Sequence, residues 1–345
     1  MSRISRFVKD IRRLDKSAFS LTRGFRAAAF VIAPIIVDFA IVHQPRLLVL
    51  ATLGAMILTN TEMQLPAIPS RILLVACFTE AVSFGLGTLA ATTGHSLTIL
   101  LLGIAVFVAL IARVSTNWAP VGTFTAIIFA IGLGLPGYSI QSAGLRALFS
   151  LIGMLWALIG VEIQRFALSH RIQLSGSDSA ANEQPRPRLD VLGSALIIGI
   201  ASALAYAIGL LLGLPRDFWA VVTIIVAVRP NISSTTTFTS MIVIGTIVGA
   251  LIALITLENS NLYLRLALLF SFAVMVFATM KVNVILTQIF LVPFIIILLN
   301  IYYPGEWYLS FIRILDVAIG GAIAVAMVYL RSALSGSRLL GNRTP

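Results

Sequence analysis

Few charged residues and almost no cysteine occur in this 345-residue chain. Only 11% of its residues are charged, against about 25% in soluble domains, so an ordinary soluble fold is excluded. The single cysteine, Cys77, has no partner for an intrachain disulfide. The three histidines (His43, His95 and His170) lie far apart along the sequence and give no metal-ligand spacing.

The motifs of nucleotide and hydrolytic chemistry are also missing. The sequence has no phosphate-cradling glycine loop, no nucleophile elbow and no clustered metal ligands. No acid–base constellation is concentrated at one membrane depth. We therefore expect no enzymatic activity, no cofactor and no metal. Any active transport by this chain alone would draw on an ion gradient.

Apolar residues make up 59% of the chain, and its mean hydropathy is +1.02. They fall into twelve stretches that suit membrane spans of roughly 20 residues. The predicted spans are 24–43, 46–60, 71–92, 96–113, 119–136, 145–168, 190–213, 217–229, 238–257, 261–280, 282–302 and 308–331. The sequence therefore predicts an all-α polytopic membrane protein with about twelve transmembrane helices.

Landmark residues of the first six stretches recur in the next six at a nearly constant offset. Arg146, Gly153 and Ala157 recur 167 positions later as Arg313, Gly320 and Ala324, Asn117 recurs as Asn283, and Thr52 and Asn60 recur as Thr223 and Asn231. Any two apolar bundles align somewhere, but this offset holds over several spans, so we interpret it as a duplication. The short spans 46–60 and 217–229 occupy matching places, which points either to a binding site or to a tilted hairpin.

The basic residues predict the orientation. With the N-terminus in the cytoplasm, most of the 24 lysines and arginines lie on the cytoplasmic side. Six spans per half is even, so the two repeats are parallel. The net charge of +11 is concentrated beside spans, which indicates lipid head groups rather than nucleic acid. The expected parts are a basic N-terminal segment, the first repeat, a cytoplasmic linker, the second repeat and a cytoplasmic tail, at 1–23, 24–168, 169–188, 189–331 and 332–345.

The second half carries a recognisable group of motifs. Asp217 to Thr223 (DFWAVVT) is followed by Arg229-Pro230-Asn231, a Ser/Thr stretch and Gly245 to Ala250 (GTIVGA). At this spacing the motifs resemble the fusaric acid resistance protein-like family, also called the integral membrane bound transporter domain. That family is related to aromatic acid exporters and to aluminium-activated malate transporters. The resemblance covers 189–331 and implies export of organic acids across an inner membrane.

Ionisable residues inside apolar spans are the candidates for a substrate path. A charge at the bilayer centre costs about 3 kcal/mol, so such residues are usually paired or face a wet cavity. Glu80 has no local basic partner and is the best single candidate for proton coupling; the alternative is a neutral glutamic acid that packs helices. Arg146 and Arg313 would draw anions from two equivalent places. Arg313 and Asp316 are three residues apart, either as a self-neutralised lock or as a proton-switchable pair.

Two further residues complete the candidates. Trp219 stands at a predicted span end, together with Phe218, Trp307 and Tyr308. An aromatic belt explains that placement, and stacking on an aromatic substrate is the alternative. Thr223 belongs to a polar cluster that would cap a helix or line a vestibule. Glu162 and Arg165 are expected to reach the interface together.

The sequence thus predicts a multi-pass inner-membrane transporter with cytoplasmic termini that exports organic or aromatic acid anions, with proton coupling as one option. A passive anion channel and a non-transporting scaffold are the alternatives. Membrane lipids and a small organic anion are the expected partners, no nucleic acid is expected, and a homo-oligomer and a periplasmic adaptor protein are left open.

Overall fold

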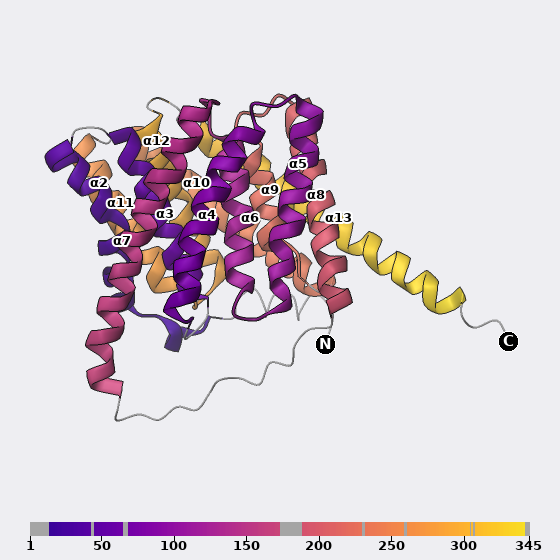
Figure 1. The fold of residues 1–345 in the computed structure, drawn as a ribbon, viewed down its shortest axis with the longest axis horizontal. Helices are drawn as coiled ribbons and strands as arrows, with labels where there is room; N and C mark the ends of the chain where they lie inside the picture. The colour runs from indigo at the N-terminus through magenta and orange to yellow at the C-terminus, as the bar shows by residue number, and fades with distance from the viewer. Residues whose placement is uncertain are drawn as a thin grey trace. The chain divides into compact units, whose positions relative to one another are not determined.

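The protein is described by a computed structural model covering residues 14–42, 45–64, 68–172, 188–229, 232–258, 261–303, 305 and 308–341. The linker positions 173–187, the basic residues before Leu14, Pro230, Asn231 and Trp307 lie outside the described residues. Within the described part the regular structure is helical throughout, so the predicted all-α class is confirmed (Figure 1).

Twelve α-helices follow the predicted apolar stretches in the described part of the chain. The first half forms α2 (Leu21–Val37), α3 (Pro45–Met63), α4 (Ser70–Ala90), α5 (His95–Ile111), α6 (Ala119–Gly134) and α7 (Ile140–Ile172). The second half forms α8 (Arg188–Leu211), α9 (Phe218–Ala227), α10 (Ile232–Glu258), α11 (Leu262–Thr279), α12 (Val284–Tyr302) and α13 (Leu309–Gly341). Among these described helices, nine segments are long and apolar enough to cross a bilayer, so the chain is a multi-pass membrane protein.

Three apolar helices are shorter, at 48–63, 119–134 and 218–227. The first and third of these are the second helix of each half, as the sequence predicts. The helix α9 has only ten residues, or about 15 Å at 1.5 Å per residue. That length covers about half of a 30 Å hydrocarbon core.

Three helix pairings of the first half recur in the second half. In the first half α3 packs on α7, and α4 packs on both α6 and α7 (Figure 1). In the second half α9 packs on α13, and α10 packs on both α12 and α13. Each pairing recurs six helices later in the chain, as a duplication predicts.

Small residues set the closest of these crossings. A Cβ added to Gly153 of α7 would lie 1.8 Å from the backbone oxygen of Ala51 in α3. A Cβ added to Gly320 of α13 would lie 2.4 Å from the backbone oxygen of Ala220 in α9. Helices in lipid associate through such close backbone approach, because lipid offers no hydrophobic drive.

The helices cluster into two compact units, which are described separately. Unit 1 comprises residues 1–28, 95–104 and 196–345, and unit 2 comprises residues 29–94 and 105–195. These units differ from the predicted repeat boundaries because the first turns of α2 and α5 pack with the second half. The expected domain boundaries therefore stay predictions based on the duplication.

Within unit 1, α2 contacts α11 and α5 contacts α8. Arg23 of α2 donates hydrogen bonds to the backbone oxygens of Phe277 and Ala278, at the end of α11. In α5, a Cβ added to Gly103 would contact Gly199 and Ala203 of α8 at 3.4–4.0 Å. The first helix of each half thus packs on the fourth helix of the other half.

Several helix ends differ from the predicted spans. The helix α2 contains Pro34, which has no backbone N–H to donate. Four residues later the helix changes to a π-helical segment, η2 (Asp38–Val42). The helix α7 continues into the predicted linker, and α13 continues into the predicted tail. The helix α10 begins six residues before the predicted span because the Ser/Thr stretch is helical.

Candidate functional site

The crossing of α9 and α13 in unit 1 brings two predicted site residues together. The guanidinium carbon of Arg313 lies 4.0 Å from the centre of the Trp219 ring. Arg313 is 7% exposed and Trp219 is 6% exposed, so this cation–π contact is formed away from bulk water. A desolvated contact of this kind contributes about 2 kcal/mol.

Arg313 keeps unused hydrogen-bonding capacity in this position. Its Nη1 is buried and has no hydrogen-bond partner among the described residues. A guanidinium is planar and carries donors in a fork that matches a carboxylate. A buried charge without its hydrogen bonds costs free energy, so the unpartnered Nη1 of this fork is suited to an anionic ligand.

Asp316 lies one helical turn from Arg313 and is fully buried. Both of its carboxylate oxygens lack a hydrogen-bond partner among the described residues. Asp316 is close enough to Arg313 and to Asp217 to interact with both charges. No ion pair joins Arg313 and Asp316 in this part of the chain, so the local pairing that the spacing allows is not formed: the guanidinium lies on Trp219 instead.

The connection between α8 and α9 adds two residues that the sequence reasoning missed. Arg216 has a positive φ of 89° and lies 4.6 Å from the centre of the Tyr303 ring. Asp217 follows as the residue before α9, and burial raises the pKa of its carboxyl from 3.8 to about 7. The Arg-Asp pair directly before Phe218 and Trp219 was the available signal, since adjacent charges at the start of an apolar run need partners.

A third arginine, Arg265, lies at the same end of unit 1 as Arg216 and Arg313. Arg265, in the first turn of α11, donates a hydrogen bond from Nη1 to the Asn300 side-chain oxygen at 2.9 Å. Asn300 lies in the last turn of α12, three residues before Tyr303. Three arginines therefore lie within or beside this end of unit 1, and Arg216 and Arg313 are both buried. Their combined field attracts anions.

Thr223 lies on α9, one helical turn after Trp219. Its hydroxyl is buried and donates to the backbone oxygen of Trp219 at 2.9 Å. Trp219 and Phe218 are also buried, so the predicted lipid-facing belt is wrong for these two residues. The centres of their rings lie 4.5 Å apart, and the Trp219 ring also contacts Arg313. Tyr308, by contrast, is 38% exposed.

Arg146 occupies the matching place on α7 but has different surroundings. Its guanidinium donates to the Thr88 hydroxyl at 2.9 Å, to the Gly132 backbone oxygen at 3.2 Å and to the Pro136 backbone oxygen. Those two carbonyls belong to the last turn of α6 and the connection after it, where helix carbonyls lack partners. Arg146 therefore ties α4, α6 and α7 together in unit 2.

Glu80 also lies in unit 2, fully buried on α4. The Thr61 hydroxyl donates to its Oε1 at 3.2 Å, and its Oε2 has no hydrogen-bond partner among the described residues. Thr88, which holds Arg146, lies eight residues further along α4, or about 12 Å at 1.5 Å per residue. The structure therefore does not bring Glu80 and Arg146 into contact.

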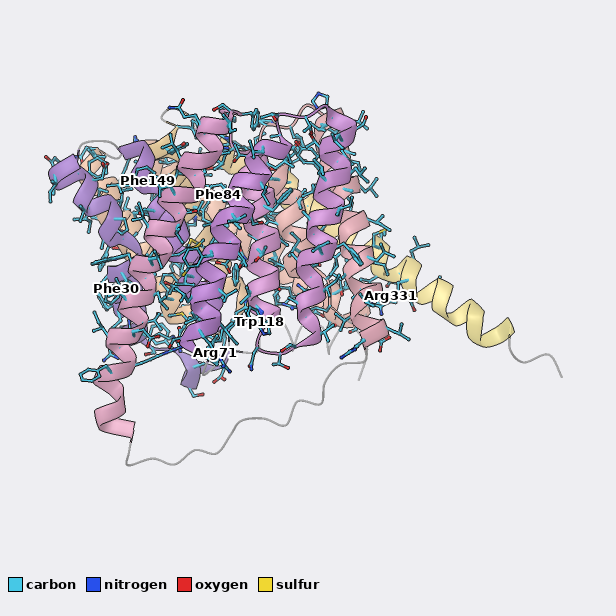
Figure 2. The ribbon with its side chains drawn as sticks, viewed as in Figure 1. Phe30, Arg71, Phe84, Trp118, Phe149 and Arg331 are labelled. Carbon is cyan, nitrogen blue, oxygen red and sulfur yellow. The ribbon has the colours of Figure 1, made fainter. Side chains whose placement is uncertain are left out.

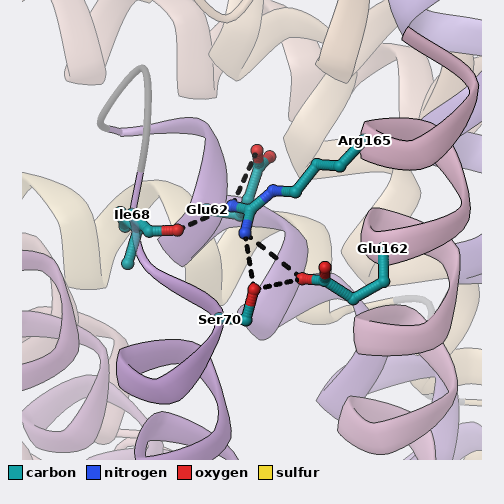
Figure 3. A network of polar contacts seen from close by, with 5 residues as sticks. All are labelled: Glu62, Ile68, Ser70, Glu162 and Arg165. Carbon is teal, nitrogen blue, oxygen red and sulfur yellow. Dashed lines mark hydrogen bonds and ion pairs between the residues drawn. The ribbon is translucent and has the colours of Figure 1, made fainter. Parts of the chain in front are cut away.

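Glu162 and Arg165 join a polar network rather than merely extending to the interface (Figure 3). Arg165 donates to Glu162 Oε1 at 3.2 Å, to the Ser70 hydroxyl at 3.1 Å and to the Ile68 backbone oxygen at 2.8 Å. The same guanidinium lies 3.9 Å from Glu62 at the end of α3. The network fastens α7 to the connection between α3 and α4. Among the described residues, no three His, Cys, Asp or Glu side chains gather as a metal site needs.

Comparison with known protein families finds a match to part of the chain. The model of the fusaric acid resistance protein-like family matches residues 204–327, from within α8 to within α13. The resemblance predicted from the second-half motifs is confirmed over that range, which contains Asp217, Trp219, Arg313 and Asp316. The matched family is one of membrane proteins of the transport or resistance type. No curated protein and no solved structure matches the chain.

Proposed function

We propose that this protein is an inner-membrane exporter of organic acid anions, aromatic acids included, and that the anion binds at Arg313. The observation that carries the proposal is the buried guanidinium of Arg313, held on Trp219 with Nη1 unpartnered among the described residues. A carboxylate at that edge would accept the missing hydrogen bonds. It would also neutralise a buried charge that the protein leaves without an ion pair.

The ring contact explains how the arginine stays available. Trp219 holds the guanidinium by its face, which leaves the in-plane donors free to point elsewhere. The carboxylate of Asp316 is one turn away and forms no ion pair with it. An incoming anion therefore meets a positioned cation and does not first have to break a salt bridge.

Asp316 is the residue we assign to proton coupling. Its buried carboxyl interacts with the Arg313 charge but accepts no hydrogen bond from the described residues. An acid in such a place can exchange a proton as the anion arrives or leaves. In that exchange Asp316 would change its charge beside Arg313 each time the anion binds or leaves. Glu80, with its Thr61 partner, remains the second candidate for this role.

Further unpartnered polar groups lie at other depths of unit 1. Among the described residues, buried oxygen atoms without a hydrogen bond occur on α10, α12 and α13, at Thr239, Thr246, Gln288 and Ser310. Gly321 of α13 contacts Thr239, and Gly245 of α10 contacts Gln288, so these groups belong to the packed core of the unit. They offer a series of polar positions along the direction of the spans.

The test is a flux assay on the purified full-length protein in proteoliposomes. Benzoate, salicylate, malate and acetate are loaded on one side, with and without a proton gradient. Our proposal expects saturable flux of at least one carboxylate, accelerated by the gradient and lost in Arg313→Gln. Flux that is equal in wild type and in Arg313→Gln would contradict it. Current that follows voltage and ignores pH would identify a passive channel instead.

A further inference from the structure

A cavity in unit 2 lies at one end of the exposed apolar surface of α4. Its volume is about 390 Å³, within the about 300–1,000 Å³ range of ligand sites. It is lined by Arg71, Ile72, Val75, Asn117 and Trp118. Figure 2 labels Arg71 and Trp118 at the same edge of the helices. These residues come from the first two turns of α4 and from the connection between α5 and α6.

The cavity carries one positive charge and few other polar groups. Arg71 is exposed and has no hydrogen-bond or ion-pair partner among the described residues. Asn117 offers an amide, and Trp118, 36% exposed, offers an indole N–H on an apolar ring. Arginine and tryptophan at a span end are residue types found at the level of lipid head groups.

An exposed apolar stripe runs from the cavity along α4. Val75, Phe78, Val82 and Leu86 are each between 41% and 55% exposed and follow one another at helical spacing. The residues between them on the opposite face, such as Ala76 and Phe84, are buried in unit 2. From Arg71 to Val82 the stripe spans about 16 Å at 1.5 Å per residue, close to the about 15 Å depth of one leaflet.

We propose that this cavity binds an anionic glycerophospholipid of the surrounding bilayer. The lipid phosphate pairs with Arg71 and accepts from the Asn117 amide. The head group fills the cavity beside Trp118, and one acyl chain lies along Val75, Phe78 and Val82. Arg71 favours a negative head group, and the apolar stripe favours an acyl chain. A lipid can contact both the arginine and the stripe, whereas a soluble anion can contact only the arginine.

The experiment measures thermal unfolding of the full-length, delipidated protein in detergent as lipid is added. Dioleoyl phosphatidylglycerol is compared with dioleoyl phosphatidylcholine, which has the same tails without net charge, and with glycerol 3-phosphate, which has the charge without tails. For the wild type we expect the unfolding temperature to rise saturably with phosphatidylglycerol only.

Three variants locate the effect. Arg71→Gln should need about fivefold more phosphatidylglycerol, since one basic residue near an anionic surface contributes about that factor. Arg26→Gln removes an exposed arginine from the second turn of α2 and is the matched control, expected to behave as wild type. Val75→Trp keeps Arg71 but fills the cavity, and it should also lose the response.

Each other outcome would overturn the proposal. An equal shift in Arg71→Gln and Arg26→Gln would show that the cavity is not where the lipid acts. Stabilisation by glycerol 3-phosphate as strong as by phosphatidylglycerol would identify a free-anion site. Equal stabilisation by phosphatidylcholine would indicate general contact with acyl chains. The site shares no residue with the centre at Arg313, so these results are independent of transport.

Discussion

Arg313 lies against the ring of Trp219, one helical turn from a fully buried Asp316 with which it makes no ion pair. Arg146, the arginine at the matching position of the first half, donates hydrogen bonds to a threonine and to two backbone carbonyls. The matching position therefore serves a structural contact in one half and leaves an available cation in the other.

The two arginines should consequently fail in different ways when they are changed. Arg146→Gln removes charge-assisted hydrogen bonds to buried groups, and we expect it to lower the free energy of unfolding by about 2–3 kcal/mol. Arg313→Gln loses the contact with Trp219, but it also removes a buried charge that lacks hydrogen bonds, so it should retain most of the stability. It should reduce carboxylate transport at least about tenfold, because a charged hydrogen bond is worth about 1.5–3 kcal/mol. Thermal unfolding and proteoliposome flux, measured on both variants, check this. The reverse pattern would contradict the assignment.

Asp316→Asn tests the coupling role directly. Asparagine keeps nearly the same volume but cannot carry or release a proton. We expect the variant to move the anion down its own gradient, with a flux that no longer changes when a proton gradient is imposed. Glu80→Gln is made in parallel on the other unit. If the gradient response disappears in Glu80→Gln and persists in Asp316→Asn, the coupling residue is Glu80.

The pH dependence of anion binding should follow Asp217. Burial raises the pKa of this carboxyl to about 7, so it is largely neutral below that pH and negative above it. Arg216 is its neighbour in the sequence, and Asp316 of α13 is close enough to interact with its charge. Above about pH 7 a second negative charge opposes the incoming anion, and we expect its half-saturating concentration to rise between pH 6 and pH 8.

The control for that profile is Asp217→Asn, which stays neutral throughout. Its half-saturating concentration should rise less across the same interval, by the amount that Asp217 contributes. The acid also contributes to stability with a definite sign. Because its folded pKa lies above the unfolded value of 3.8, the folded state loses stability as pH rises from about 4 to about 7. Asp217→Asn should flatten that decline, and an unchanged slope in the variant would contradict the assignment.

Two glycines of α7 give a matched test of the helix crossing. Gly153 has no room for a Cβ, which would lie 1.8 Å from the Ala51 backbone oxygen, whereas Gly144 has nothing within 4 Å. Gly153→Ala should destabilise the protein by about 1–3 kcal/mol through overpacking. Gly144→Ala should be neutral or stabilising by up to about 1 kcal/mol, since alanine favours a helix. Chemical or thermal unfolding in detergent measures both.

Much of the fold could be predicted because membrane helices are defined by length and apolarity. The ends of α4, α5 and α12 lie within two residues of the predicted spans. The recurring landmarks also identified Gly153 and Gly320, which occupy equivalent crossings. Helix ends were less predictable outside the apolar runs. There, α7 and α13 extend into polar sequence, because a helix satisfies its own backbone whether or not lipid surrounds it.

The site was only partly predictable for a different physical reason. Spacing placed Arg313 and Asp316 on one face of a helix, but it did not reveal that the guanidinium reaches Trp219 on another helix. Likewise, the partners of Arg146 are backbone carbonyls, which every sequence contains, so no residue pattern marks them. Asp217 was missed because its burial depends on how the connection between α8 and α9 folds back.

The reciprocal packing of α2 and α5 has a consequence for biosynthesis. Arg23 bonds to Phe277, 254 positions later in the chain. At about 5–20 residues per second, a ribosome needs roughly 10–50 s to cover that interval. For that time the leading helices sit in the bilayer before their final neighbours have been made. The newly inserted first half is therefore an intermediate with open helix surfaces, and its maturation waits for α8 and α11 to arrive.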